Sequence, residues 1–273
     1  MVRAYLLGTA TVTVPRDSAT VALVRDGEFG PDVYLIRRHT GMEFASGMYV
    51  FVGGSVDPMD ADIDSAWMGP PPRAWAEKFR CSEELARMLV CAAVRETFEE
   101  SGVLLASSAD GALISDTTGD DWESERLSLV EGTLSFAALI ERRSLVLRAD
   151  LLRAWSHWIT PEWSRRRFDT RFFVAAVPPG QTPRDVGGEA DQVGWHSCSR
   201  ALTSYHSGAL PMMIPTASLV RDLAAHPDAA AILSASRQIE PIMLRPILND
   251  ERIELVWDAY RGVLPAEELI RPL

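Results

Sequence analysis

Residues 95–103 carry the stretch of sequence that decides the fold. They read Arg95-Glu96-Thr97-Phe98-Glu99-Glu100-Ser101-Gly102-Val103. On an α-helix, Glu96, Glu99 and Glu100 fall within an arc of about 100° and therefore share one face. Like charges at these spacings repel one another, and the last turn of a helix disfavours anions. A cation that gathers the carboxylates would remove both penalties, and clustered hard oxygen ligands suit Mg²⁺ or Mn²⁺.

Three glutamates alone also fit a charged, solvated helix face, so the surrounding sequence must decide between the two interpretations. Upstream, Ser82 followed by Glu83 and Glu84 is typical of a helix N-terminus. Apolar residues follow at helical spacing, and Gly102 is a natural stop. The pattern predicts a helix of about 20 residues over 83–101, with Arg95 able to reach Glu99 one turn later.

Short β-prone runs flank this helix in the sequence. Residues 20–24 and 33–36 with a glycine-containing turn between them predict a hairpin, and 48–52 predicts a strand that runs directly into Gly53-Gly54. Further strands are expected at 167–177 and 193–195. Helices are expected near 122–129, 135–143 and 149–157, and the part after about residue 199 is expected to be mostly helical. Without repeats or a long linker, residues 1–273 are expected to form one α/β domain.

Residues 55–80 interrupt this pattern. They contain four aspartates and Pro70-Pro71-Pro72, and they show no sustained period. We interpret the stretch as an ordered insertion or loop without a continuous helix, because proline lacks an N–H donor. Its acidic residues are expected to form a solvated face. Trp155, Trp158 and Trp163 are expected to pack in the core or at its rim.

The segment after Arg95 resembles the second half of the Nudix box, Gly-x5-Glu-x7-Arg-Glu-U-x-Glu-Glu-x-Gly-U, where U is a bulky apolar residue. The residues that match in register are Arg95, Glu96, Glu99, Glu100, Gly102 and Val103. Gly53-Gly54 resembles the glycine pair that opens the box. Thr97 departs from the pattern, and the position of its first glutamate is Arg87. Gly54 precedes Arg95 by 41 positions instead of 14, so 27 additional residues (the insertion at 55–81) split the box.

A split box is similar to that of the Nudix hydrolases related to the mammalian peroxisomal coenzyme A diphosphatase. The resemblance extends over most of the chain, through residues 37–54, 93–96, 158–161 and 167–173, although Val52 replaces the usual proline. It implies a mixed β-sheet between helices, with an insertion in the box and a helical C-terminal extension. It also implies cleavage of a diphosphate bond. The role of the missing first glutamate is either lost or taken from the insertion, where Asp57 is a weak candidate.

The resemblance further implies roles for individual residues. Glu96, Glu99 and Glu100 are the expected metal-binding set, with a backbone carbonyl at Gly53, and Arg95 orients a carboxylate. The general base is Glu96 or a loop carboxylate, Glu189 or Asp191. Arg37, Arg38 and the run 165–167, including Arg167, are candidates for the substrate's phosphates, since arginine donates two parallel hydrogen bonds.

The substrate implied by the resemblance is coenzyme A or acyl-coenzyme A, with nucleoside diphosphate sugars, ADP-ribose and NADH as alternatives. A module that binds a nucleotide without cutting it is the competing interpretation, because the first glutamate of the box is missing. A net charge of −11 makes extended nucleic acid a poor partner.

The composition of the chain limits the class of protein to which it can belong. Of its residues 47% are hydrophobic and 24% charged, which is an ordinary globular composition. Cys81, Cys91 and Cys198 are widely spaced and are expected to be free structural thiols. No apolar run has the length of a membrane span, so a soluble, cytoplasmic protein is expected. The sequence leaves the choice between monomer and homodimer open.

Overall fold

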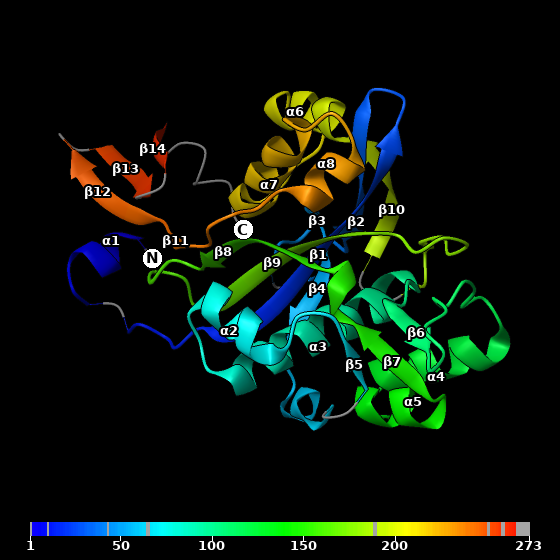
Figure 1. Cartoon of the computed structure of the whole chain (residues 1–273). Helices are drawn as coiled ribbons and strands as arrows, with labels where there is room; N and C mark the ends of the chain where they lie inside the picture. The colour runs from blue at the N-terminus through cyan, green and yellow to red at the C-terminus, as the bar shows by residue number, and fades with distance from the viewer. Residues whose placement is uncertain are drawn as a thin grey trace.

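A mixed β-sheet forms the middle layer of the molecule in the computed structural model (Figure 1). The structure describes residues 2–9, 11–42, 44–63, 66–187, 190–249, 252–257 and 260–265. Along the sheet the strand order is β10-β2-β1-β9-β8-β11, with β3 beside β2 and β4 beside β1. The bounds of these strands are β1 Arg16–Gly27, β2 Gly30–Arg38, β3 Tyr49–Val50, β4 Val52–Ser55, β8 Arg153–Ile159, β9 Phe168–Ala176, β10 Ala190–Ser197 and β11 Pro241–Met243.

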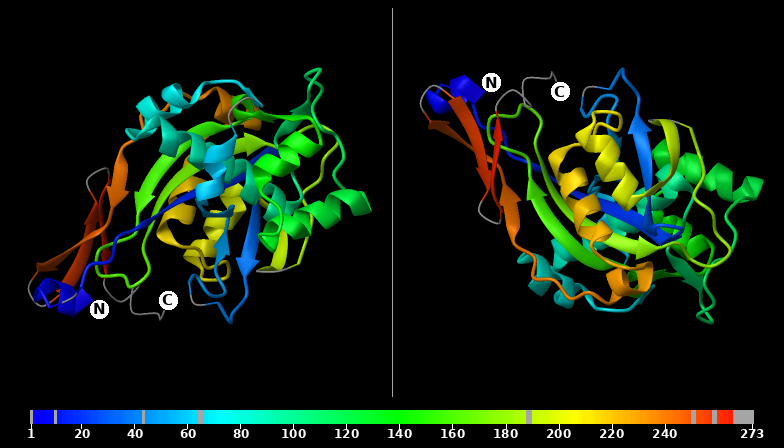
Figure 2. Two further views of the ribbon diagram at one scale, coloured as in Figure 1. Left: turned by 90° about the horizontal axis from the view of Figure 1, so that it is seen from below. Right: turned by 90° about the horizontal axis from the view of Figure 1, so that it is seen from above.

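Helices cover both faces of this sheet. One face packs against α2 (Pro72–Phe79) and α3 (Glu83–Ser101), and the other against α6 (Cys198–His206), α7 (Ile214–Ala224) and α8 (Ala229–Ser234). Figure 2 shows the two helical layers from opposite sides of the sheet. Alternate residues of the strands feed two separate hydrophobic cores, because successive side chains of a strand point to opposite faces. The predicted α/β fold with a mixed sheet between helices is confirmed.

The predicted hairpin is formed by β1 and β2, which pair antiparallel from Val24 and Val33 to the turn. The strand predicted at 48–52 is two short strands with different partners. Strand β3 pairs with β2, whereas β4 pairs with β1. Strand β2 therefore diverges from β1, and β4 takes its place beside β1. This divergence brings the glycine pair of β4 next to the centre of the sheet.

Helix α3 has the bounds that its sequence predicts. The Ser82 hydroxyl accepts a hydrogen bond from the Leu85 N–H, and Gly102 ends the helix at φ 71°. At Thr97, where an apolar residue was expected, the side chain is fully buried and its hydroxyl donates to the Ala93 carbonyl at 2.7 Å. Because the hydroxyl has this hydrogen-bond partner inside the helix, threonine at this position leaves no buried polar group unpaired.

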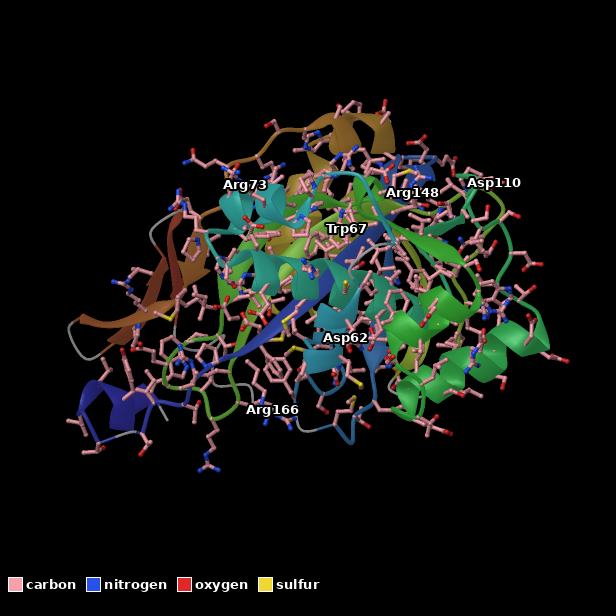
Figure 3. The ribbon with its side chains drawn as sticks, turned by 60° about the horizontal axis from the view of Figure 1, so that its bottom comes forward. Asp62, Trp67, Arg73, Asp110, Arg148 and Arg166 are labelled. Carbon is pink, nitrogen blue, oxygen red and sulfur yellow. The ribbon has the colours of Figure 1, made fainter. Side chains whose placement is uncertain are left out.

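The insertion is more regular than the sequence predicted. It contains a 3₁₀ turn η1 (Pro58–Asp62), strand β5 (Trp67–Met68) and helix α2, and Figure 3 marks these elements at Asp62, Trp67 and Arg73. The expectation that no continuous helix forms here is wrong. Helix α2 starts with Pro71 at the N-cap and Pro72 at its first position, where no N–H donor is needed.

A second, small sheet joins the insertion to the segment after α3. Its strand order is β5-β7-β6, and helices pack beside it. The remaining elements of this region are β6 Ala106–Ser108, α4 Asp120–Val130, α5 Phe136–Arg142, β7 Leu145–Arg148 and the 3₁₀ turn η2 Ala149–Leu151. Helices α4 and α5 confirm the predictions for 122–129 and 135–143.

The helix predicted near 149–157 is wrong, because strand β8 occupies most of this stretch. A β-bulge shifts the register between Ala154 and Ser156. The bulge puts Trp155 and Trp158 on the same side of the sheet, three residues apart, where both are buried. An apolar spacing of three is typical of a helix, and here a bulged strand imitates it. The expected packing role of Trp155, Trp158 and Trp163 is confirmed.

Among the described residues after 199, the helices end at Ser234, and the helical prediction is wrong for the described residues beyond it. From Pro241 onward the chain forms strands. After β11, the strands β12 (Arg245–Asn249), β13 (Arg252–Trp257) and β14 (Tyr260–Pro265) form an antiparallel sheet of their own. A short helix α1 (Val2–Leu6) stands at the other end of the chain.

The three cysteines are free, as predicted, with Cys91 and Cys198 buried. In the part of the chain that the structure describes, no helix is both long and apolar enough to cross a membrane.

An aromatic cluster shows that the insertion belongs to the core. Phe79 at the end of α2 is 2% exposed and meets the ring of Phe173 in β9 edge-on at 5.3 Å. We expect Phe79→Ala to lower the free energy of unfolding by about 3–5 kcal/mol in denaturant titrations. Met68→Ala is the control within the insertion, because Met68 is 41% exposed, and it should change stability by less than about 1 kcal/mol. Equal effects of both substitutions would contradict an insertion built into the core.

Candidate active site on helix α3

The glycine pair allows strand β4 to lie directly against the acidic face of α3. A Cβ atom on Gly54 would lie 2.5 Å from the carboxyl carbon of Glu96, so a larger residue would displace that carboxylate. A Cβ atom on Gly53 would lie 2.6 Å from the Cα of Thr20 in the neighbouring strand. Gly53 is therefore required by its close approach to the backbone of β1, and Gly54 leaves the Glu96 carboxylate in its place.

The three glutamates of the helix each have a partner at this contact. The Gly53 N–H donates to Glu100 Oε2 at 2.7 Å. Arg95 Nη1 donates to Glu96 at 2.8 Å and to Glu99 at 3.2 Å. The contact between Arg95 and Glu99 confirms the one-turn reach that the sequence predicts. The structure thus brings Arg95, Glu96, Glu99, Glu100 and Gly53 together.

Asp60 of the insertion also joins this group. It is 2% exposed and accepts hydrogen bonds from Arg95 Nε and Nη2 at 2.9 and 3.0 Å. The expectation that the acids of the insertion form a solvated face is wrong for this residue. Asp57, the weak candidate, instead caps η1 by accepting from the Met59 N–H.

Burial makes this place unfavourable for negative charge. The side chains of Glu96 and Glu99 are 13% and 12% exposed. Burial raises the pKa of Glu96 to about 7, against the opposing charge of Arg95, and the neighbouring charge of Glu99 adds to the rise. Burial also raises the pKa of Glu99, again opposed by Arg95. A cation bound beside the carboxylates would favour their ionised forms.

The residues fit a divalent metal ion by the chemistry of their donors. Carboxylate oxygens and a backbone carbonyl are the ligands that Mg²⁺ and Mn²⁺ prefer. The glycine pair keeps the space beside Glu96 free of other side chains. Within the described residues, no three His, Cys, Asp or Glu side chains already converge on one point. This agrees with the observed partners, since Arg95 and the Gly53 N–H hold the carboxylates.

Two arginines secure the C-terminal end of α3, which carries Glu99 and Glu100. Arg126 of α4 is 2% exposed and donates to the Glu99 carbonyl at 2.7 Å. Arg184 lies so close to Gly102 that a Cβ atom there would be 2.5 Å from its guanidinium carbon. Cations at this end of a helix offset its dipole, which the acidic last turn would otherwise oppose. Neither arginine can be assigned to this site from the sequence, because no local pattern connects residues 126 and 184 to the helix.

The same arginines hold the loop that follows β9. Arg126 Nη2 donates to the Val186 carbonyl at 3.2 Å, and the Arg184 N–H donates to the Ser101 carbonyl at 3.0 Å. Gln181 accepts from the Leu104 N–H at 2.8 Å. The loop between residues 178 and 187 is therefore fixed to the end of the catalytic helix.

Of the two loop carboxylates predicted as candidates for the general base, the structure describes only one. Glu189 lies outside the described residues. Asp191 is at the start of β10, 3.8 Å from Arg37 Nε.

The three arginines predicted to bind substrate lie in different places. Arg37 and Arg38 stand at the end of β2, where they donate to the carbonyls of Gly47 and Phe44. Arg167 is 7% exposed and donates to the carbonyls of Thr160 at 2.9 Å and Thr13 at 2.6 Å. The structure thus places Arg167 in backbone contacts at the start of β9 and does not bring it to the glutamates.

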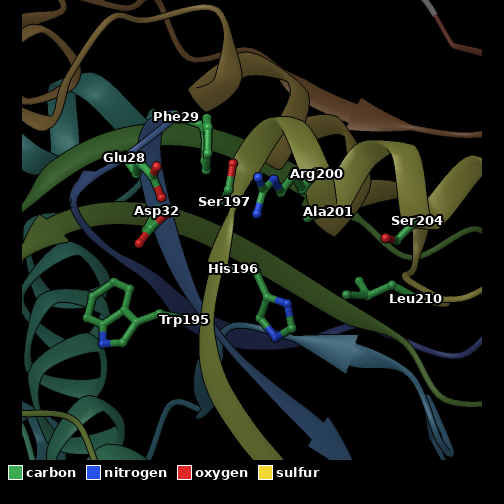
Figure 4. A pocket seen from close by; sticks show the side chains of 10 residues that line it. All are labelled: Glu28, Phe29, Asp32, Trp195, His196, Ser197, Arg200, Ala201, Ser204 and Leu210. Carbon is green, nitrogen blue, oxygen red and sulfur yellow. The ribbon is translucent and has the colours of Figure 1, made fainter.

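A separate hollow of about 350 Å³ lies at the tip of the β1–β2 hairpin, between β10 and α6. Figure 4 shows Trp195 and His196 on opposite sides of β10, with Arg200 and Phe29 above them. The guanidinium of Arg200 lies 3.9 Å from the centre of the Phe29 ring. None of the glutamates of α3 lines this hollow.

A mixed sheet, a glycine pair and a helix with this acidic face define a Nudix hydrolase. The model of the NUDT19 Nudix domain matches residues 76–222, more than half of the chain. The chain therefore belongs to the NUDT19 Nudix domain family. The match contains α3 and starts after the glycine pair.

Individual relatives agree with this assignment. The chain is 27% identical over 215 residues to the acyl-coenzyme A diphosphatase NUDT19 of Xenopus laevis, a match that covers 64% of this chain and 55% of that protein. It is 29% identical over 230 residues to the human protein of the same name, covering 70% and 60% respectively. The matched part thus spans somewhat more than half of each relative. A crystal structure of a NUDIX hydrolase from Alicyclobacillus acidocaldarius superposes with a TM-score of 0.73 at 30% identity, covering 84% of this chain and 99% of that one.

The buried guanidinium of Arg126 provides a test of the link between α4, α3 and the loop. We expect Arg126→Met to lower the free energy of unfolding by about 3 kcal/mol or more, because it leaves the Glu99 and Val186 carbonyls without this donor. Arg142→Met is the control, since Arg142 is 61% exposed and pairs with Glu125 at 3.4 Å, and it should change stability by about 0.5 kcal/mol or less. Denaturant titration of both variants measures the difference. A loss below 1 kcal/mol for Arg126→Met would show that the link is dispensable.

Proposed function

We propose that this chain is a divalent-metal-dependent hydrolase that cleaves the phosphoanhydride bond of a nucleoside diphosphate derivative. One observation carries the proposal: the three glutamates of the box share one face of α3 and meet the glycine pair of β4 through Glu96 and Glu100. All three carboxylates are retained despite the split box. In this proposal residues 1–273 act as one Nudix domain.

The metal-binding set would be Glu96, Glu99 and Glu100, with the carbonyl of Gly53. A bound Mg²⁺ or Mn²⁺ lowers the pKa of water and neutralises charge on the phosphoryl oxygens. Arg95 keeps Glu96 and Glu99 oriented by charge-assisted hydrogen bonds from one guanidinium. Gly54 leaves the Glu96 carboxylate in contact with the strand that carries Gly53.

The proton of the attacking water needs an acceptor. Glu96 is the first candidate, because its carboxylate already lies within the site and is held in place by Arg95. Glu189 and Asp191 are the alternatives. Asp191 stands at the start of β10, which follows the loop that Arg126 and Arg184 fix to α3. Asp191 lies near Arg37, so a substrate phosphate bound by Arg37 would approach this acid as well.

Coenzyme A and acyl-coenzyme A are the first candidate substrates, because two relatives carry the name acyl-coenzyme A diphosphatase. Cleavage of coenzyme A would release adenosine 3′,5′-bisphosphate and a 4′-phosphopantetheine product. Arg37 and Arg38, at the end of β2, are the candidate partners of the substrate's phosphates. Arg167 is the weaker candidate, because its guanidinium already binds two backbone carbonyls.

Product analysis by mass spectrometry tests the proposal. The protein is incubated with coenzyme A, ADP-ribose, NADH or a dinucleoside polyphosphate, in the presence of Mg²⁺ or Mn²⁺ and, separately, of a chelator. We expect metal-dependent cleavage of one compound, reduced at least about 100-fold in Glu100→Gln, which keeps the side chain's size and removes its charge. Binding of a compound in metal-free buffer without any product under either metal would replace the hydrolase by a nucleotide-binding module.

The contact of Gly54 with Glu96 gives a second test. Gly54→Ala adds one methyl group against the carboxylate, and we expect turnover to fall by about 100-fold, because small misplacements of catalytic groups have effects of this size. Gly194→Ala in β10 is the matched control, since a Cβ atom at Gly194 meets nothing within 4 Å. Circular dichroism verifies that both variants fold. Turnover of Gly54→Ala within threefold of the wild type would refute the role of this contact.

A further inference from the structure

We propose that Asp60, supplied by the insertion, is the positioning residue that completes the split box by fixing the guanidinium of Arg95. This inference rests on the proposed function, since it concerns the same metal-binding carboxylates. Sequence position 87, where the box has its first glutamate, is an arginine in this chain. The helix therefore lacks the first glutamate of the box, and the structure places the carboxylate of Asp60 against Arg95.

The hydrogen bonds of Arg95 show why Asp60 determines its orientation. A guanidinium has five N–H donors in one rigid plane. All five are used: Nε and Nη2 donate to the two oxygens of Asp60, Nη1 donates to Glu96 and Glu99, and the second hydrogen of Nη2 donates to the Ser55 carbonyl at 3.0 Å. Two parallel bonds to one carboxylate fix both the place and the rotation of the plane. Nη1 is then directed at the two glutamates.

Asp60 is itself held in a fixed place. Its second oxygen, Oδ2, accepts from the Asp57 N–H at 2.8 Å, and the Asp57 side chain accepts from the Met59 N–H at 2.8 Å. These reciprocal bonds form a capping box on η1. With 2% of its surface exposed, Asp60 is shielded from water, so its charge is compensated mainly by Arg95.

The balance of charge gives Asp60 its effect on the metal-binding carboxylates. Arg95 faces three buried carboxylates, so it cannot neutralise all of them. While Asp60 takes two of its five donors, Glu96 and Glu99 receive only one hydrogen bond each. Without the Asp60 charge, the guanidinium is free to turn and pair bidentately with one of the glutamates. That glutamate would then compete with the metal ion for its own oxygens.

The test compares Asp60→Asn with Asp62→Asn in the full chain. Both residues lie in η1 and both substitutions remove one negative charge, but Asp62 is exposed, and its substitution leaves the pair between Asp60 and Arg95 intact. Four quantities are measured: Mn²⁺ affinity from the electron paramagnetic resonance signal of free Mn²⁺, the melting temperature in chelator, and kcat and KM with the substrate found by product analysis.

For Asp60→Asn we expect Mn²⁺ affinity and kcat to fall by about 10–100-fold, with KM changed less than threefold. Asp62→Asn should stay within threefold of the wild type in Mn²⁺ affinity, kcat and KM. Asp60→Glu, which keeps the charge on a longer arm, should recover part of the lost Mn²⁺ affinity. It also keeps the test valid if Asp60→Asn does not fold.

The inference is overturned if Asp60→Asn loses only melting temperature and keeps wild-type Mn²⁺ affinity and kcat, or if Asp62→Asn lowers Mn²⁺ affinity and kcat as much as Asp60→Asn does. Failure of the proposed function looks different. In that case the wild type turns over no substrate, while the comparison of Mn²⁺ affinities still decides the role of Asp60.

Discussion

The close approach of strand β4 to helix α3 is the constraint on which the rest of the structure depends. Four register pairs with β1 fix β4 in the sheet, and the buried apolar face of α3 fixes the helix on the same sheet. A side chain at Gly54 would displace the Glu96 carboxylate. The acidic face of the helix therefore meets a backbone, which offers one N–H to Glu100. The geometry of the sheet thus sets the geometry of the carboxylates.

This arrangement concentrates negative charge where a helix tolerates it least. Glu99 and Glu100 stand in the last turn, at the negative end of the helix dipole. Arginines from three different elements offset this charge. They are Arg95 within the helix, Arg126 from α4, and Arg184 from the loop after β9. Arg126 also binds the loop that leads to β10, and Arg184 is part of that loop. The same contacts therefore offset the negative charge at the helix end and hold this loop in place.

Much of the architecture followed from local pattern. The bounds of α3 could be predicted to the residue because a serine cap, helical spacing and a terminal glycine agree. The hairpin and β9 have equally plain signals. Strand β8 was mistaken for a helix because its bulge gives Trp155 and Trp158 a helical spacing. The late strands after Pro241 have too little alternation to separate them from helix.

The candidate site divides in the same way. Residues of the box could be recognised because their spacing along one helix carries the chemistry. Asp60, Arg126 and Arg184 could not, because their contacts with α3 join residues that are 27 to 82 positions apart. For Arg167, a basic residue in a conspicuous run, the sequence predicts a substrate contact but does not reveal that the fold directs its donors to two backbone carbonyls. Sequence spacing identifies groups on one element, and tertiary contact decides their partners.

The integration of the insertion has an evolutionary consequence. Strand β5 pairs with β7, α2 packs its aromatic rings against β9, and Asp60 reaches Arg95. A deletion that restored the uninterrupted spacing would remove all three together, and position 87 would still be an arginine. Deleting the insertion would therefore not restore a working uninterrupted box, because the neighbouring elements depend on its contacts. Lineages with this architecture are expected to vary the insertion by substitution and to keep its length.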